Sequence, residues 1–570
     1  MREKLLHRGP DGKGSFAAGA VAIAHSRLAV IDPEGGAQPF FNESRSVGVV
    51  YNGAIYNFRQ LRGELQSLGH TFRTASDTEV IAHAWQQWGE AAVTRFRGMF
   101  AFCLIDLRRK LAFLARDHFG IKPLVYSFET GQFLFASEIG AVRAGRNGAD
   151  ELDLDALDEY LHLGYISAPR SVFRGIQKLP AAHTLTVHFD GSTEGPKRYW
   201  RFEPAVERGR SFADWTEELE AILRDSVRAH MVADVPIGAF LSGGIDSSLV
   251  VSLLAQEAGA QIKTYSVEFA NDLNSEAPFA RLVSRRWETE HREMAIDQSS
   301  LEVLPEMLRR FGEPFADWAA VPLYNLARRA QGESVVCLTG DGGDELFGGY
   351  NSYAHWLRDI QRGLGSVQRW KERLIQVMPA HATSGLWRRE LRSHLSGRVR
   401  ALETAFEDSA EFPPLEQAMD LDRQTYLPSR LLNKTDIATM MCGIEARTPM
   451  LDLRVAECAA RMPSSYKLRL GTRLYHDHSK RVLKRALSEY FPKSFVRRPK
   501  TGFSPPFQTW LTRDRRFRDS ITDRLCGKGA RIHEYLRPSA ISDLVGSVET
   551  MTLVEPVWAL LCLEIWLQDR

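Results

Sequence analysis

Short apolar or alternating segments, separated by glycine, proline, asparagine and aspartate, fill the first 190 or so residues. Strands are brief and end at such turn residues, so this pattern predicts strands. They are expected at 47–51, 100–105, 111–115, 133–136 and 184–189. Apolar residues at helical spacing predict helices over 56–68 and 78–88. We therefore expect a layered mixture of antiparallel strands and helices in this part of the chain.

The pattern changes after residue 210. Residues 201–210 are charged and hold a single proline, as in a linker. Ser211 then precedes apolar residues at steps of three and four, which predicts a capped amphipathic helix. Uniformly apolar segments follow, with helical stretches between them, including a helix over 247–258; the segments are 235–241, 262–269 and 335–338. Such alternation predicts a parallel sheet covered on both faces, followed by a mostly helical remainder from about residue 353.

These two patterns predict two domains, at 1–200 and 211–570, in an α+β and α/β chain. The composition is that of a globular protein, with 570 residues of which 44% are hydrophobic and 25% are charged. The 73 Lys and Arg nearly cancel the 71 Asp and Glu, so nucleic acid is not an expected partner.

The sequence also indicates where the protein is expected to be located. It has no 18-residue apolar run and no apolar segment at the amino terminus, so neither membrane insertion nor secretion is expected. The six cysteines include no Cys-x-x-Cys pair, which argues against a disulfide framework or structural zinc and for a cytoplasmic protein.

One Ser/Gly loop carries the sharpest chemical signal. It lies between a predicted strand and a predicted helix and includes Ser242, Gly243, Gly244, Asp246 and Ser247. Glycines let the backbone approach an anion, and helix amides point at it. A carboxylate in an anion site calls for a cation, so we expect Mg²⁺ between Asp246 and phosphates. The alternative is a Ser/Gly turn that only caps a helix.

A second loop, 338–350, follows the third strand and holds five glycines and three carboxylates. The carboxyl ends of parallel strands share one sheet edge, so these acids should lie beside the first loop. Asp344 is the second expected Mg²⁺ ligand, and Asp341 should lie near the substrate. A solvated acidic turn is the alternative. Gly-Lys-Ser/Thr is absent, so neither loop is a Walker loop.

The first loop resembles the pyrophosphate (PP) loop of ATP pyrophosphatases, and the chain as a whole resembles the glutamine-hydrolysing asparagine synthetases. In the second half the matching motifs are 242–247, 313–317, 341–350, 445–452 and 497–503. The resemblance implies that Leu241, Val267, Thr339 and Gly340 contact the adenine nucleotide. It also implies that Lys500 stabilises charge during adenylation and amide formation. A solvated Lys500 is the alternative, because Arg497 and Arg498 make this a basic run.

The first half resembles the family's class II glutamine amidotransferase domain, an N-terminal nucleophile (Ntn) hydrolase with an αββα sandwich. The matching motifs are 7–12, 27–32, 51–57, 76–79 and 115–124. The resemblance implies that glutamine is held by Arg27, Asn52, Gly53 and Asp77, since an amino acid needs a guanidinium for its carboxylate and an acid for its ammonium.

Two features depart from that domain. The family's nucleophile is an amino-terminal cysteine, which is absent here, and Ala54 stands where the family usually has glutamate. Cys103 does not substitute, because it is internal to an apolar strand. Three explanations stay open: a misplaced start, a true truncation that leaves an ammonia-dependent synthetase, and a relative with a decayed glutaminase, as in β-lactam synthetases and lasso-peptide cyclases.

The resemblance implies amidation of aspartate through β-aspartyl-AMP, with ATP and Mg²⁺. Glutamine would donate nitrogen in a full-length form, and ammonia would do so for the chain as written. A non-catalytic ATP-binding protein is the remaining alternative. Homodimers are usual in the family.

Overall fold

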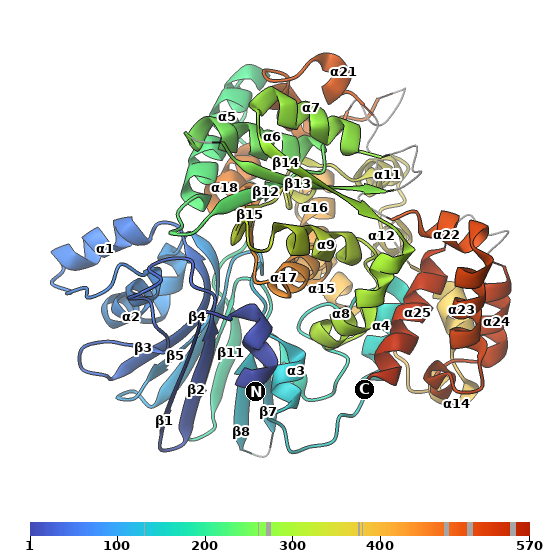
Figure 1. Ribbon diagram of the computed structural model, residues 1–570, viewed down its shortest axis with the longest axis horizontal. Helices are drawn as coiled ribbons and strands as arrows, with labels where there is room; N and C mark the ends of the chain where they lie inside the picture. The colour runs from blue at the N-terminus through green and yellow to red at the C-terminus, as the bar shows by residue number, and fades with distance from the viewer. Residues whose placement is uncertain are drawn as a thin grey trace.

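The computed structural model describes residues 1–129, 131–259, 261–269, 275–373, 377–378, 380–471, 478–498, 505–547 and 554–570. The first part of the chain forms the strand-rich region at the lower left of Figure 1, and the second part forms the helix-rich region above and to the right of it. No helix among the described residues is long and apolar enough to cross a membrane.

A six-stranded antiparallel sheet is the centre of the first part. Its strand order is β11-β10-β6-β5-β4-β3. The strands are β3 (Phe40–Phe41), β4 (Val47–Ile55), β5 (Gly98–Asp106), β6 (Leu111–Arg116), β10 (His183–His188) and β11 (Thr193–Arg198).

Alternation along these strands builds two layers. Val49 and Phe102 point to one face, where helices α1 (Phe58–Ser67) and α2 (Asp77–Trp88) cover them. Val50 and Cys103 point to the other face and pack on residues of two smaller sheets. The result is a helix–sheet–sheet arrangement in which the helices lie on the left in Figure 1.

The two smaller sheets are separate. One is the hairpin of β1 (Gly12–Ala18) and β2 (Val21–Arg27), and the other has the order β8-β7-β9. The strands of the latter are β7 (Val125–Glu129), β8 (Gln132–Ala136) and β9 (Ile176–Lys178). Before β1 the chain forms the short helix η1 (Arg2–Arg8).

A five-stranded parallel sheet is the centre of the second part. Its order is β14-β13-β12-β15-β16. The strands are β12 (Ile237–Phe240), β13 (Lys263–Phe269), β14 (Glu290–Ile296), β15 (Val336–Leu338) and β16 (Glu445–Arg447). The chain leaves β12 toward β13 on one side, and β15 lies on the other side, so the topology switches between β12 and β15.

Helices cover both faces of this sheet. Ala239 faces α5 (Phe212–His230) and α6 (Ile245–Glu257), and Phe240 belongs to the core formed with α8 (Leu304–Phe311) and α9 (Ala320–Ala330). The remaining helices are α3 (Ile139–Arg143), α4 (Leu154–Leu163), α7 (Ala277–Trp287), α10 (Gly343–Phe347), α11 (Asn351–Gln361), α12 (Val367–Arg373), α13 (Ala380–Leu386), α14 (Arg389–Arg392), α15 (Arg400–Asp408), α16 (Pro414–Gln424), α17 (Leu432–Met440), α18 (Leu453–Arg461), α19 (Ser464–Lys467), α20 (Arg481–Leu487), α21 (Lys493–Val496), α22 (Phe507–Arg513), α23 (Arg515–Cys526), α24 (Pro538–Gly546) and α25 (Glu555–Gln568). Short 3-10 or π segments are η2 (Gly89–Arg95), η3 (Gln298–Val303), η4 (Leu427–Leu431), η5 (Pro449–Leu451) and η7 (Arg531–Glu534).

The fold class expected from the sequence is confirmed, as are the strands and helices predicted above. Ser211 accepts a hydrogen bond from the amide of Asp214 and forms a full capping box with it, as its position before the helix predicts. Strands β1, β2, β3, β7, β9, β11, β14 and β16 were not predicted. β1, β11 and the first half of β14 are poor in apolar residues, and β2 begins with four consecutive apolar residues rather than an alternation.

Buried ion pairs join the two parts of the chain. Asp436 of α17 accepts hydrogen bonds from Arg8 Nη2 at 2.6 Å and from Lys122 Nζ at 3.2 Å, and Arg8 also donates to Glu138 at 3.1 Å. All four side chains are at most 6% exposed. The two neighbouring cations keep the pKa of Asp436 below its usual value despite burial.

Candidate functional sites

The Ser/Gly loop turns β12 into α6. Gly243 has a φ of +84°, and a Cβ there would lie 2.7 Å from the amide nitrogen of Ala280, so only glycine fits. Ser242 Oγ lies 3.0 Å from Ser247 Oγ and accepts from the Gly244 amide at 3.1 Å. No side chain caps the start of α6, so its first amides point toward the loop, as an anion site requires.

The second loop touches the first. A Cβ on Gly340 would lie 2.6 Å from the amide nitrogen of Ser247, so the close approach of the loops depends on glycine. Asp341 Oδ2 accepts from Thr435 Oγ1 at 2.9 Å and from Thr339 Oγ1 at 3.1 Å. Burial raises the pKa of Asp341.

Lys480 joins the carboxylates of the two loops. Its Nζ forms an ion pair with Asp344 Oδ1 at 2.8 Å and another with Asp246 Oδ2. Lys480 is 6% exposed, and the two carboxylates hold its pKa above the usual value although burial lowers it. The residue precedes α20 with a φ of +50°, which is unusual for lysine.

The donor set fits Mg²⁺. Two carboxylates from different loops converge on one cationic nitrogen, and carboxylate oxygens are the protein ligands that Mg²⁺ takes beside phosphates. Asp246 and Asp344 are therefore the residues that would hold this ion.

A cavity of about 510 Å³ lies at this sheet edge, next to the switch between β12 and β15. It brings together eight of the residues predicted for this site, namely Ser242, Gly244, Asp246, Ser247, Thr339, Gly340, Asp341 and Asp344. Leu241, Gly243 and Val267 do not line it: Leu241 is fully buried, and Val267 is 7% exposed in the core. Lys500 lies outside the described residues.

The cavity also holds cations that the sequence did not single out. Besides Lys480 they are Arg430, Lys434, Lys484 and Arg498. Asp317 Oδ2 accepts from Arg430 Nε at 3.1 Å and lies 3.6 Å from Lys434 Nζ. Arg498 donates to the carbonyl of Gly243, and burial lowers its pKa to about 10. The contact of Arg498 places a positive charge beside the Ser/Gly loop.

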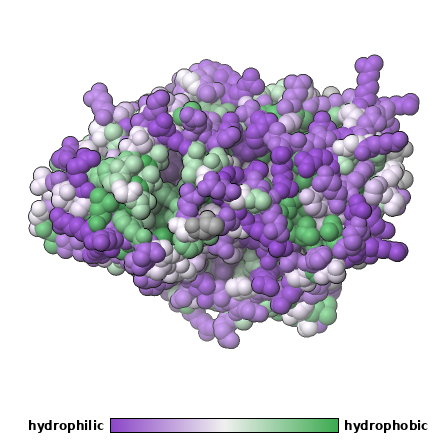
Figure 2. Space-filling view, turned by 90° about the horizontal axis from the view of Figure 1, so that it is seen from below, coloured by the Kyte–Doolittle hydropathy of each residue, from purple (hydrophilic) through white to green (hydrophobic). Residues whose placement is uncertain are grey.

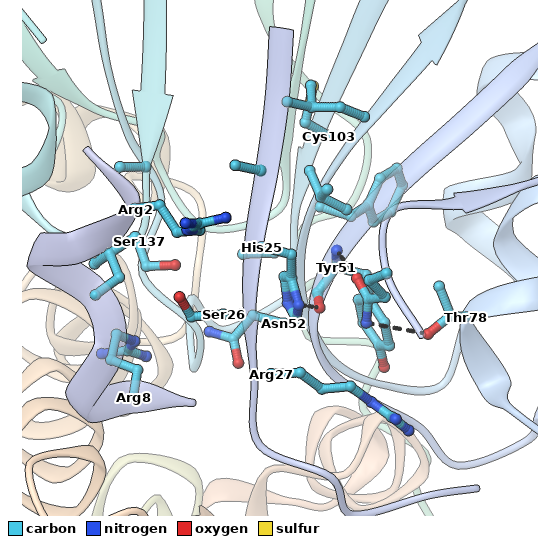
Figure 3. A pocket seen from close by; sticks show the side chains of 18 of the residues that line it. Arg2, Arg8, His25, Ser26, Arg27, Tyr51, Asn52, Thr78, Cys103 and Ser137 are labelled. Carbon is cyan, nitrogen blue, oxygen red and sulfur yellow. Dashed lines mark hydrogen bonds between the residues drawn. The ribbon is translucent and has the colours of Figure 1, made fainter. Parts of the chain in front are cut away.

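A second cavity, of about 450 Å³, lies in the first part of the chain and is shown in Figure 3. All four residues predicted to hold glutamine line it, namely Arg27, Asn52, Gly53 and Asp77. Asp77 Oδ2 accepts from Tyr51 Oη at 2.8 Å and from the Ile55 amide at 3.0 Å. Burial raises the pKa of Asp77 to about 6.

Two side chains limit the reactions and contacts that this cavity can provide. The guanidinium of Arg27 donates to the carbonyls of Ile31, Asp32 and Pro33, so it orders that loop while it lines the cavity. Cys103 also lines the cavity, but it is 1% exposed and burial raises its pKa. A thiol with a raised pKa is a poor nucleophile, which agrees with the expectation that Cys103 does not replace the missing cysteine.

The fold and the two cavities define a two-part protein, with the Ser/Gly loop on a parallel sheet and a cavity of about 450 Å³ against an antiparallel one. Comparisons with known proteins match both parts. The model of the family described as asparagine synthase matches residues 218–568, and the model described as glutamine amidotransferase domain matches residues 1–200.

Two curated relatives come from Bacillus subtilis. Asparagine synthetase [glutamine-hydrolyzing] 1 is 32% identical over 542 residues, which cover 90% of this chain and 84% of that protein. Asparagine synthetase [glutamine-hydrolyzing] 3 is 31% identical over 563 residues, which cover 92% of this chain and 88% of that protein. The chain belongs to the asparagine synthase family.

Proposed function

We propose that the chain amidates aspartate to asparagine at the expense of ATP. The observation that carries the proposal is the convergence of the Ser/Gly loop, Asp246, Asp344 and Lys480 at one sheet edge, in a chain of this family. The side-chain carboxylate of aspartate attacks the α-phosphorus of ATP, the bond to the β-phosphate oxygen breaks, and pyrophosphate leaves. Ammonia then attacks the acyl carbon of β-aspartyl-AMP, loses a proton, and displaces AMP.

The roles follow from the contacts. The amides at the start of α6 and the hydroxyls of Ser242 and Ser247 bind phosphate oxygens. Mg²⁺, when bound by Asp246 and Asp344, offsets phosphate charge. Lys480 supplies the positive charge beside the α-phosphorus, where negative charge develops. Asp341, whose pKa is raised by burial, is proposed to take the proton that ammonia loses. Lys500 keeps its proposed part in charge stabilisation.

The nitrogen donor depends on the first part of the chain. Arg27, Asn52, Gly53 and Asp77 are proposed to hold glutamine, with Arg27 on its carboxylate and Asp77 on its ammonium. A form that carries the family's cysteine nucleophile would release ammonia here for use in the second part. A polypeptide without that nucleophile can draw only on free ammonia. Proposed domain limits are 1–200 and 211–570, and a cytoplasmic homodimer is the proposed state.

The test supplies the chain with aspartate, MgATP and either ammonium or glutamine, and follows asparagine and AMP together. Asparagine from ammonium but not from glutamine is expected. Asp246→Ala should abolish AMP formation, whereas Glu90→Gln, an exposed change in the first part, should leave it intact. Normal turnover in Asp246→Ala would refute the metal assignment.

Other outcomes identify the alternatives. AMP formed only with a different carboxylic acid would point to a relative that activates another substrate. ATP binding with no AMP from any donor, in a folded sample, would point to a non-catalytic protein.

A further inference from the structure

A histidine and two glutamates of the first part meet outside both cavities. Glu79 and His83 lie one turn apart on α2, and Glu43 lies in the turn between β3 and β4. α2 packs against β3 at the lower left of Figure 1, so this turn reaches the helix. His83 Nε2 lies 3.5 Å from Glu79 Oε1 and 3.8 Å from Glu43 Oε1. We name these three residues the α2 triad.

Burial distinguishes the α2 triad from ordinary surface charges. Most of the face seen in Figure 2 is hydrophilic, so charged groups near one another do not by themselves mark a site. Glu79 and His83, however, are at most 1% exposed, whereas Glu43 reaches solvent. A buried charge is costly unless an opposite charge or a metal ion compensates it.

The carboxylate of Glu79 is held in place and charged. It accepts hydrogen bonds from the Thr74 hydroxyl at 2.6 Å, from the Thr74 amide at 2.7 Å and from the Arg73 amide at 2.9 Å. Burial raises the pKa of Glu79, but the ring of His83 and these hydrogen bonds outweigh burial and lower the pKa to about 2. A negative charge therefore faces His83 near neutral pH.

The ring of His83 turns its lone pair toward the two carboxylates. Its Nδ1 lies 3.1 Å from Gln86 Oε1, and because a carbonyl oxygen only accepts, Nδ1 carries the proton and donates it. In the neutral ring Nε2 is then an acceptor, and it faces two further acceptors. Among the described residues, buried His83 Nε2 has no hydrogen-bond partner. A cation between Nε2 and the carboxylates would satisfy all three groups.

The spacing of the three groups fits zinc. Zn²⁺ binds imidazole nitrogen and carboxylate oxygen at about 2.0–2.2 Å in a tetrahedral arrangement, which separates two ligand atoms by about 3.3–3.6 Å. The observed 3.5 Å and 3.8 Å are close to this separation and longer than an N–H···O hydrogen bond of about 2.7–3.2 Å. Mg²⁺ and Ca²⁺ prefer oxygen ligands and would leave Nε2 unsatisfied. Gln86 matches the outer partner that fixes the tautomer of a metal-binding histidine.

We propose that the α2 triad binds one Zn²⁺ through His83 Nε2 and one carboxylate oxygen each of Glu79 and Glu43, with water as the fourth ligand on the solvent side. The ion would fix the turn between β3 and β4 onto α2, the helix that begins at Asp77. It would therefore act as a structural ion, separate from the Mg²⁺ proposed at Asp246 and Asp344.

The test measures zinc binding to the whole chain by equilibrium dialysis. The chain is stripped of metal with a chelator and dialysed against a series of buffered zinc concentrations, in excess Mg²⁺ that competes with zinc at Asp246 and Asp344. Glu43→Gln weakens one ligand, and Gln86→Leu removes the outer partner of His83. Both side chains are exposed, so the fold should tolerate these changes. Glu90→Gln, an exposed change just beyond α2, is the matched control.

The parent chain and Glu90→Gln should bind one zinc ion per chain with equal affinity. Gln86→Leu should weaken this binding about 10–100-fold, and Glu43→Gln should weaken it at least about tenfold. Because a ligand that binds only the folded state stabilises it, zinc should also raise the thermal unfolding midpoint of the parent more than that of Glu43→Gln.

Three results would overturn the proposal. They are the absence of stoichiometric zinc in the parent, equal zinc affinity in the parent and Glu43→Gln, and a loss of binding that occurs only in Asp246→Ala, which would place the ion at the Ser/Gly loop. Unchanged affinity in Gln86→Leu would refute the tautomer assigned to His83. Zinc binding is measured without turnover, so its failure leaves asparagine formation untouched, and failure of that reaction leaves the α2 triad untouched.

Discussion

Replacing Lys480 with methionine tests the anion site most directly. Methionine keeps most of the side-chain length and removes the ammonium that Asp246 and Asp344 share. Two poorly exposed carboxylates then face each other without that cation, and loss of one member of a buried ion pair costs up to about 3–5 kcal/mol. We expect lower stability without metal and substantial recovery on adding Mg²⁺, because the ion replaces the lost positive charge.

The same change should act on chemistry more than on binding. A charge beside the α-phosphorus that matters mainly in the transition state is worth about 10²–10³ in kcat. We therefore expect kcat and kcat/KM for ATP to fall together, with KM within a few fold of the parent. The assay measures AMP release with aspartate, MgATP and ammonium, at saturating Mg²⁺ so that folding is not limiting.

A matched control separates this effect from a general loss of charge. Lys493→Gln removes an exposed lysine in α21 and should leave kcat and stability unchanged. A kcat for Lys480→Met within about threefold of the parent would refute the assignment of Lys480 to the developing charge.

Three further changes test other parts of the structure. Asp77→Asn should stabilise the chain at pH 8 but not below pH 4, as urea unfolding would show. Burial raises this carboxyl pKa from 3.8 to about 6, so its ionisation lowers stability progressively between these values, by about 3 kcal/mol once the pH exceeds 6. Equal effects at both pH values would contradict this. Asp436→Ala leaves Lys122 buried without its carboxylate and Arg8 with Glu138 alone, and should cost about 3–5 kcal/mol in thermal or urea unfolding; a cost under 1 kcal/mol would show that the pairs contribute little. Gly340→Ala places a Cβ 2.6 Å from the Ser247 amide and should reduce AMP formation severely, whereas Gly546→Ala, which meets no atom within 4 Å, should be silent.

The sequence predicts those elements whose apolar spacing reflects burial. Strands such as β4 and β5 have apolar residues on two covered faces, and the central strands β12 and β15 of the parallel sheet are apolar throughout. Edge strands carry no such signal. In β11 every residue is exposed, and β14 alternates charged and apolar residues only weakly, because backbone pairing rather than burial holds them. Their existence follows from the neighbouring strand, which a pattern along one segment does not show.

The candidate site likewise has residues that the sequence predicts and residues that it does not. The Ser/Gly loop can be predicted from a short segment, because its glycines, serines and acid lie within a few residues of one another. The structure places its polar members around one cavity. The position of Lys480 in the site cannot be predicted from a short segment. It lies 234 residues from Asp246, within a basic run that is typical of a solvated helix face. The spacing of residues around it indicates neither its burial nor its φ of +50°.

The functional lysine that the resemblance selected, Lys500, lies outside the described residues, while Lys480 contacts both proposed metal ligands. The role of a lysine in catalysis depends on the charges around it. Asp246 follows β12 and Asp344 follows β15, so these charges meet Lys480 only after the sheet has formed. Local spacing can therefore specify where phosphate binds. Which cation meets it is decided by the topology that brings the ends of separate strands to one edge.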